Sequence, residues 1–271
     1  MTFFAVAAVA FVWLAAAMAG AWAVQRATRN CGWVDAIWSA ATGLGAAGAA
    51  LAPIAGAPHA PRAWLAAGMV AAWGLRLAGH IAQRTTGGAE DARYAAFRRE
   101  WGAAFERRLF GFLMVQAAAA WVLVASVLVA AHNPAPMPQA TDVAALLVLV
   151  AAVAGEALAD AQLRRFRAAA TGGICDTGLW AWSRHPNYFF EFLAWCAYPL
   201  LAIDLSGDYP AGLLCLAAPL MMFGLLRYVS GVPPLEQAML ARRGDAFRAY
   251  QACVSPFFPL PPRRRAGSAT P

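Results

Sequence analysis

Long apolar stretches, separated by short segments rich in arginine, dominate the pattern of this chain. Seven of them approach or exceed the roughly 20 residues that a transmembrane helix needs. The predicted spans are Phe3–Val24, Ala36–Ile54, Trp64–Ile81, Phe110–Ala131, Val143–Asp160, Tyr188–Ile203 and Pro210–Arg227. The second is interrupted by glycines and the sixth is short. The pattern predicts an all-α fold, a polytopic integral membrane protein with seven transmembrane helices.

A run of glycines, Gly43, Gly45 and Gly48, lies in the second predicted span. Small residues let two helices approach closely inside a membrane. We therefore interpret this run as a helix-packing surface and not as a ligand-binding loop.

Arginine is concentrated in alternate connecting segments, which sets the predicted orientation. These segments hold Arg26 and Arg29; Arg84, Arg93, Arg98, Arg99, Arg107 and Arg108; Arg164, Arg165, Arg167 and Arg184; and Arg242, Arg243, Arg248 and Arg263 to Arg265. The opposite loops hold Arg62 together with Asp142, Asp204 and Asp208. We expect the N-terminus outside and the C-terminus in the cytoplasm.

Composition agrees with a membrane protein, because 61% of the 271 residues are hydrophobic and only 13% are charged. The net charge of +7 comes from arginine without lysine. In such a chain we attribute it to topology and not to nucleic-acid binding. The alanine-rich, lysine-free composition indicates a bacterial inner membrane. We predict one domain over residues 1–259, a basic disordered tail over 260–271, free cysteines and no metal site.

Ionisable and polar side chains gather at the predicted cytoplasmic ends of the spans. They are Asp35 with Ser39 and Thr42; Arg76, His80 and Arg84; Gln116; Glu156, Asp160, Arg164 and Arg167; Asn187 and Glu191; and Arg227. Buried ionisable groups usually mark a site in a membrane protein. The alternative is that arginines at helix ends reach lipid phosphates, which leaves the carboxylates unexplained. We expect a shared polar cavity open to the cytosol.

The excess of arginine favours an anionic ligand for that cavity. The chain contains no G-x-G-x-x-G motif, and without lysine it cannot form a Walker A loop. The densest polar motif is GLWAWSRHPNYFFEFLAW, in which Arg184, His185, Asn187, Tyr188 and Glu191 fall at a predicted helix N-terminus. A helix N-terminus favours phosphate groups.

Several motifs resemble the bacterial branch of the steroid 5-alpha-reductase family. They are SRHPNYFFE, EALADAQLRRFR, RNCGWVDAIW, EDARY and SGVPPLE, and the similarity runs from about Cys31 to Pro259. The RHPNY element is also similar to sterol reductases and to isoprenylcysteine-type membrane methyltransferases. The combination of motifs is what favours the steroid-reductase-like group.

The resemblance implies a seven-span enzyme that uses NADPH to reduce a conjugated enone, as in a 4-ene-3-ketosteroid. Hydride would go to the β-carbon, and the lipid-soluble substrate would enter from the membrane. The resemblance places Asp160, Arg164, Arg167, Asn187, Tyr188 and Glu191 at the cofactor. From their positions we add Arg76, Arg84, Glu156, Arg184 and His185 to the cofactor-binding candidates.

Asp35 lies near the position of the acidic residue that polarises the ketone in that family. The animal enzymes carry a Gln-Glu pair there and a tyrosine on the next span, whereas this chain has Asp35 alone, with Trp73 or Arg76 facing it. We therefore predict that a desolvated, protonated Asp35 donates to the carbonyl oxygen. The alternative is that Asp35 pairs with Arg29 or caps its helix.

Two other functions stay open. The chain could be a membrane methyltransferase that uses S-adenosylmethionine on a lipid-like acceptor, or a lipid-binding protein without enzymatic activity. The methyltransferase cofactor has no phosphate, so the Arg164 and Arg167 pair would then have no role. No sequence feature indicates an obligate protein partner.

Overall fold

The computed structural model describes residues 1–55, 61–87, 92–169, 172–204 and 206–263. Within these ranges the regular elements are helices, and Ser183 and Ser255 form an isolated β-bridge. The predicted all-α fold is confirmed. Residues 264–271 of the predicted tail lie outside the described residues. Residues 260–263 are held to the protein, since Leu260 N donates to Trp182 O and Arg263 N donates to Cys253 O.

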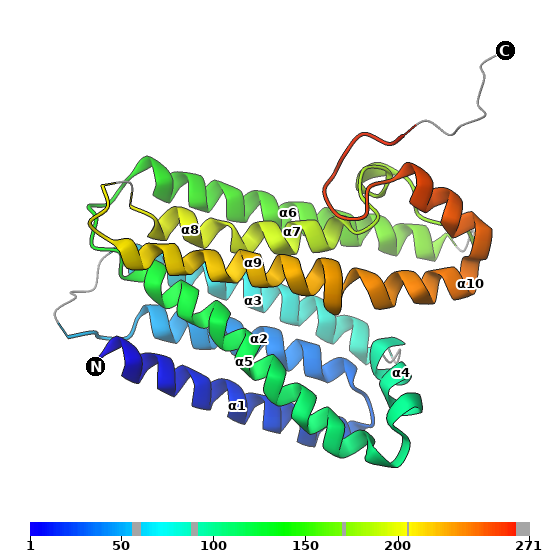
Figure 1. Cartoon of the computed structure of the whole chain (residues 1–271), viewed down its shortest axis with the longest axis horizontal. Coiled ribbons are helices and arrows are strands. Elements are labelled where there is room, and N and C mark those ends of the chain that lie inside the picture. Colours follow the sequence, from blue (N-terminus) through cyan, green and yellow to red (C-terminus); the bar gives the residue numbers. More distant parts are fainter. Residues whose placement is uncertain (56–60, 88–91, 170–171, 205, 264–271) are drawn as a thin grey trace. The chain divides into compact units, whose positions relative to one another are not determined.

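The chain forms two compact units. Unit 1 comprises residues 1–146 and 196–218. It contains α1 (Phe3–Thr28), α2 (Gly32–Ala50), α3 (Pro61–Thr86), α4 (Ala92–Trp101), η1 (Gly102–Ala104), α5 (Phe105–Ala131), α8 (Ala197–Ala202), η3 (Pro210–Leu216) and the start of α6 (Ala140–Ala168). Within it α1, α2, α3 and α5 pack against one another (Figure 1).

Unit 2 comprises residues 147–195 and 219–271. It contains the rest of α6, the short helix η2 (Gly178–Ala181), α7 (Pro186–Trp195), most of α9 (Ala217–Gly224), the π-helical turn η4 (Leu225–Val229) and α10 (Val232–Cys253).

Five helical segments among the described residues are long and apolar enough to cross a membrane. They are Phe3–Thr28, Pro61–Thr86, Arg93–Ala131, Ala140–Ala168 and Pro210–Cys253. The remaining two predicted spans correspond to α2 and to α7 with α8. A membrane protein is supported, while the number of seven spans and the orientation stay predictions.

The sixth predicted span is not one helix. It is divided into α7 and α8 at Cys196. The cause is Pro199, which has no N–H to donate to the carbonyl of Trp195 and whose ring crowds that carbonyl. The predicted bounds of the sixth span took no account of this proline.

Close packing of α2 on α3 explains part of the glycine run. A Cβ on Gly43 would lie 3.0 Å from the Gly74 Cα, and one on Gly74 would lie 2.8 Å from the Gly43 Cα. Gly45 faces the Trp13 side chain of α1, whereas Gly48 has nothing within 4 Å of a Cβ. The helix-packing interpretation is confirmed for Gly43 and Gly45.

A buried network around Arg62 and Asp142, called the clamp below, joins the start of α3 to the segment before α6 in unit 1. Arg62, in the first turn of α3, is almost fully buried. All five of its N–H donors are used: two reach Asp142, and three reach the carbonyls of Asn133, Ala135 and Pro136. This arginine, which lies in the loops opposite the arginine-rich segments, is therefore neutralised within the protein.

Helix α10 is a hairpin of two helical limbs. Gly244 has φ 49° and ψ −123°, which breaks the helical path, and Figure 1 shows α10 turning back on itself. Met239 and Leu240 on the first limb pack on Phe247 and Tyr250 of the second. Glycine is required at the turn because other residues rarely adopt a positive φ.

Candidate functional site

The predicted site residues are divided between the two units. Asp35, Arg76 and Arg84 belong to unit 1, whereas the candidates of α6 and of the RHPN motif belong to unit 2. The expected shared cavity therefore stays a prediction, and each group is described by itself.

Asp35 is not a lone carboxyl. Its Oδ1 accepts a hydrogen bond from the Tyr94 hydroxyl at 2.9 Å, and its Oδ2 accepts one from Arg93 Nη2 at 2.5 Å. Both partners lie on α4, and the expected alternative partner was Arg29. Both carboxylate oxygens therefore accept hydrogen bonds from α4. The role of Asp35 as a protonated donor stays a prediction.

Tyr94 lies beside Asp35, and its side chain is buried. Its hydroxyl donates a hydrogen bond to Asp35. Trp38 of α2 donates its Nε1–H to the Gln116 carbonyl of α5, which ties the two helices together beside the cluster. The phenol is thus buried beside the ion pair of Asp35 with Arg93.

The candidates on α6 form one helix face with a gradient of exposure. Glu156 and Asp160 are buried, whereas Arg164 and Arg167 are exposed. Their spacing of four, four and three residues places them along one side of the helix. The face runs from carboxylates that can accept from hydroxyl groups to guanidinium groups that can bind phosphate.

Arg184 of the RHPN motif is held by protein groups. Its Nε and Nη2 donate to the two carboxylate oxygens of Glu236, at 2.7 and 3.2 Å. Its Nη1 donates to the carbonyls of Gln251 and Val254, at 3.1 and 2.5 Å. Four of its five N–H donors are therefore used, and this guanidinium is positioned to join both limbs of the α10 hairpin rather than to bind phosphate.

His185 is buried next to Arg184, with its Nε2 3.1 Å from Glu236 Oε1. The carboxylate can only accept, so Nε2 carries the proton and Nδ1 is a bare acceptor, which has no hydrogen-bond partner among the described residues. Burial lowers the pKa of His185, and the hydrogen bond to Glu236 opposes that shift.

The rest of the motif forms the start of α7. Asn187 and Tyr188 are half-buried, and the Tyr188 ring stacks on the His185 ring with centroids 5.5 Å apart. Glu191 is buried and accepts a hydrogen bond from Trp195 Nε1 at 3.1 Å. The prediction of a polar helix start is confirmed for Asn187 and Tyr188, because α7 begins at Pro186.

Comparison with known proteins places this architecture in a family. The DUF1295 family, described as a protein of unknown function, matches residues 21–254.

The chain belongs to the DUF1295 family.

A curated relative, the uncharacterized protein C594.04c of Schizosaccharomyces pombe, is 33% identical over 87 residues. That stretch is 32% of this chain and 24% of the yeast protein, so the match spans about a quarter of the relative's length. No solved structure matches.

Three groups in this DUF1295 protein carried no predicted role. They are Arg93 and Tyr94 at Asp35, and Glu236 at the RHPN motif. Each lies within a motif of the resemblance, EDARY or SGVPPLE. The sequence therefore contained these residues within recognised motifs. Their contacts could not be predicted, because the motifs and their partners are far apart in the sequence.

Proposed function

We propose that this DUF1295 protein is an NADPH-dependent membrane reductase that saturates a conjugated enone of a lipid-soluble substrate, such as a 4-ene-3-ketosteroid. The observation that carries the proposal is the contact between Tyr94 and Asp35. The resemblance implies an acidic residue together with a tyrosine on the next span, and here the tyrosine at Asp35 comes from α4 instead.

The residues on α6 fit the proposed cofactor. Asp160 and Glu156 can accept hydrogen bonds from ribose hydroxyls, and Arg164 and Arg167 are exposed for bidentate contacts with phosphates. Arg184 fits less well, because Glu236 and two carbonyls occupy it. When bound, NADPH supplies the hydride for the β-carbon of the enone.

The task of the chain's own residues is to stabilise the oxygen of the substrate as it becomes an enolate. Tyr94 has a single O–H, which in the structure points to Asp35. In the proposed mechanism the hydroxyl turns to the substrate carbonyl, while Arg93 keeps the Asp35 carboxylate neutralised.

Binding of the cofactor is testable without any substrate. In detergent, the purified protein should bind NADPH much more tightly than NADH. Arg164→Ala and Arg167→Ala should each weaken NADPH binding by roughly 1.5–3 kcal/mol, the range for a hydrogen bond to a charged group. Arg165→Ala is the matched control, because Arg165 is also exposed but lies between the two on another side of α6.

Unchanged NADPH affinity in both test variants would reject this placement of the phosphates. Binding of S-adenosylmethionine in place of NADPH would instead support the methyltransferase alternative.

A further inference from the structure

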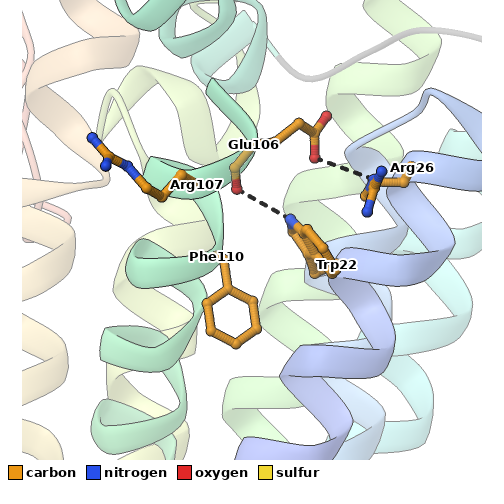
Figure 2. Close-up of a pocket in the computed structure, with 5 residues that line it drawn as sticks. All are labelled: Trp22, Arg26, Glu106, Arg107 and Phe110. Atoms are coloured by element: carbon orange, nitrogen blue, oxygen red, sulfur yellow. Dashed lines mark hydrogen bonds and ion pairs between the residues drawn. The ribbon is translucent and has the colours of Figure 1, made fainter. Parts of the chain in front are cut away.

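An open groove on unit 1 has no role in the proposed reaction. It has a volume of about 490 Å³ and lies between the last turns of α1 and the first turns of α5. Its lining residues are Trp22, Arg26, Glu106, Arg107 and Phe110. Figure 2 shows Arg26 beside the Trp22 ring, whereas the Arg107 side chain extends away from the two rings.

The groove lies at one end of a seam that is suited to lipid. Helix α1 is apolar, and most of its residues are not covered by the rest of the protein, as is expected of a helix that faces lipid. Aromatic pairs join α1 to α5 at three levels: Trp22 with Phe110, Phe11 with Trp121, and Phe3 with His132. From Phe3 to Trp22 a helix rises roughly 28 Å, about the thickness of the hydrocarbon core.

Specific contacts between side chains hold the walls of the groove in place. Trp22 Nε1 donates to the Glu106 carbonyl at 3.1 Å, and the Trp22 and Phe110 rings meet edge to face with centroids 5.5 Å apart. The Arg26 guanidinium lies 4.7 Å from the centre of the Trp22 ring. These contacts give the groove an aromatic floor with a cation on it.

The net charge of the groove is positive despite Glu106. The Glu106 carboxylate accepts a hydrogen bond from the buried Gln25 side chain at 2.8 Å. Its contact with Arg26 is longer, at 3.9 Å, and both side chains are about half exposed. Such a loose, exposed pair is weak, so Arg26 keeps its attraction for another anion, and Arg107 is exposed as well.

We propose that this groove binds an anionic phospholipid, with its phosphate at Arg26, an acyl chain along Trp22 and Phe110, and Arg107 adding positive charge nearby. The combination of guanidinium groups with an aromatic floor at the end of a lipid-facing seam matches the two halves of such a molecule. A soluble anion would use the arginines but not the floor. The site is independent of the proposed reductase chemistry.

Native mass spectrometry of the full chain, with phosphatidylglycerol or phosphatidylcholine added in detergent, tests the site. The double variant Arg26→Gln/Arg107→Gln should bind phosphatidylglycerol roughly ten- to thirtyfold more weakly, from about 1 kcal/mol for each arginine near a membrane surface. Arg29→Gln/Arg108→Gln removes the same charge from exposed neighbours that do not line the groove. This control should bind as the unaltered protein does.

Equal losses in the two double variants would overturn the proposal, since the attraction would then be a general effect of charge. Displacement of phosphatidylglycerol by millimolar inorganic phosphate would also overturn it, because the aromatic floor would have no part. Glu106→Gln supplies a test with the opposite sign. It removes the competing anion and should tighten phosphatidylglycerol binding severalfold, and weaker binding would contradict the charge argument.

Discussion

Arg62 and Asp142 form a two-pronged ion pair in which Nε and Nη2 of the arginine lie 2.8 and 3.0 Å from the two carboxylate oxygens. Both side chains are almost fully buried, with 1% and 2% exposed. Removing one partner would leave the other charge buried and unpaired, which typically costs about 3–5 kcal/mol.

Arg62→Ala should therefore lower the melting temperature in detergent strongly, and Arg62→Lys should rescue little, because lysine cannot make the forked contact. Arg248→Ala is the matched control. Arg248 pairs with Asp245 at 2.7 Å, but both are exposed, so the loss should be within about 1 kcal/mol. Equal effects of Arg62→Ala and Arg248→Ala would contradict the clamp.

A second prediction concerns the contact of α2 with α3. Gly74→Ala would place a Cβ 2.8 Å from the Gly43 Cα, so the helices would have to separate, at a cost of roughly 1–3 kcal/mol. Gly79→Ala, on the same helix, meets nothing within 4 Å and should be neutral or slightly stabilising. Melting temperatures of the two variants test the contact. An unchanged melting temperature in Gly74→Ala would refute the close packing of α2 on α3.

The pH dependence of stability should report on His185. Burial lowers its pKa in the folded protein below the ordinary value of 6.5, so the unfolded chain binds a proton first as the pH falls. The stability that depends on neutral His185 is thus fully present above about pH 6.5 and is lost below it.

His185→Gln should flatten the fall in melting temperature between about pH 6.5 and 5, even if its melting temperature at neutral pH is lower. His132→Gln, outside the RHPN motif, is the control. An unchanged slope in His185→Gln would show that another group is responsible.

The proposed acid is tested by kinetics. Tyr94→Phe should slow hydride transfer to a 4-ene-3-ketosteroid by roughly 10²–10⁴-fold, the usual contribution of a general acid, while NADPH still binds. Tyr228→Phe is the control, because Tyr228 is 63% exposed. Full activity in Tyr94→Phe with an inactive Asp35→Asn would restore Asp35 as the donor.

The hydrophobic pattern was sufficient to predict the long apolar helices, such as α1, α5 and α6. It failed where a single residue decides the backbone. Pro199 divides the sixth predicted span, and Gly244 reverses α10. Neither residue changes the mean hydropathy of its segment enough to be noticed, although both act through φ and the backbone hydrogen bonds.

The candidate site shows the same division. Polar residues one or two turns apart on one helix, such as Glu156, Asp160 and Arg164, could be grouped from spacing alone. The contacts of Asp35 with Tyr94 and of Arg184 with Glu236 join residues 59 and 52 positions apart. Periodicity carries no information about such pairs, so the contact of Arg184 with Glu236 was not predicted.

The distance in sequence between Arg184 and its partners has a consequence for biosynthesis. Glu236 follows it by 52 residues and Val254 by 70. At about 5–20 residues per second, the ribosome needs roughly 3–14 seconds to make the chain that separates Arg184 from Val254. Until Glu236 has been made, the guanidinium has none of its final acceptors, so a nascent chain that stalls before that point carries an uncompensated cation.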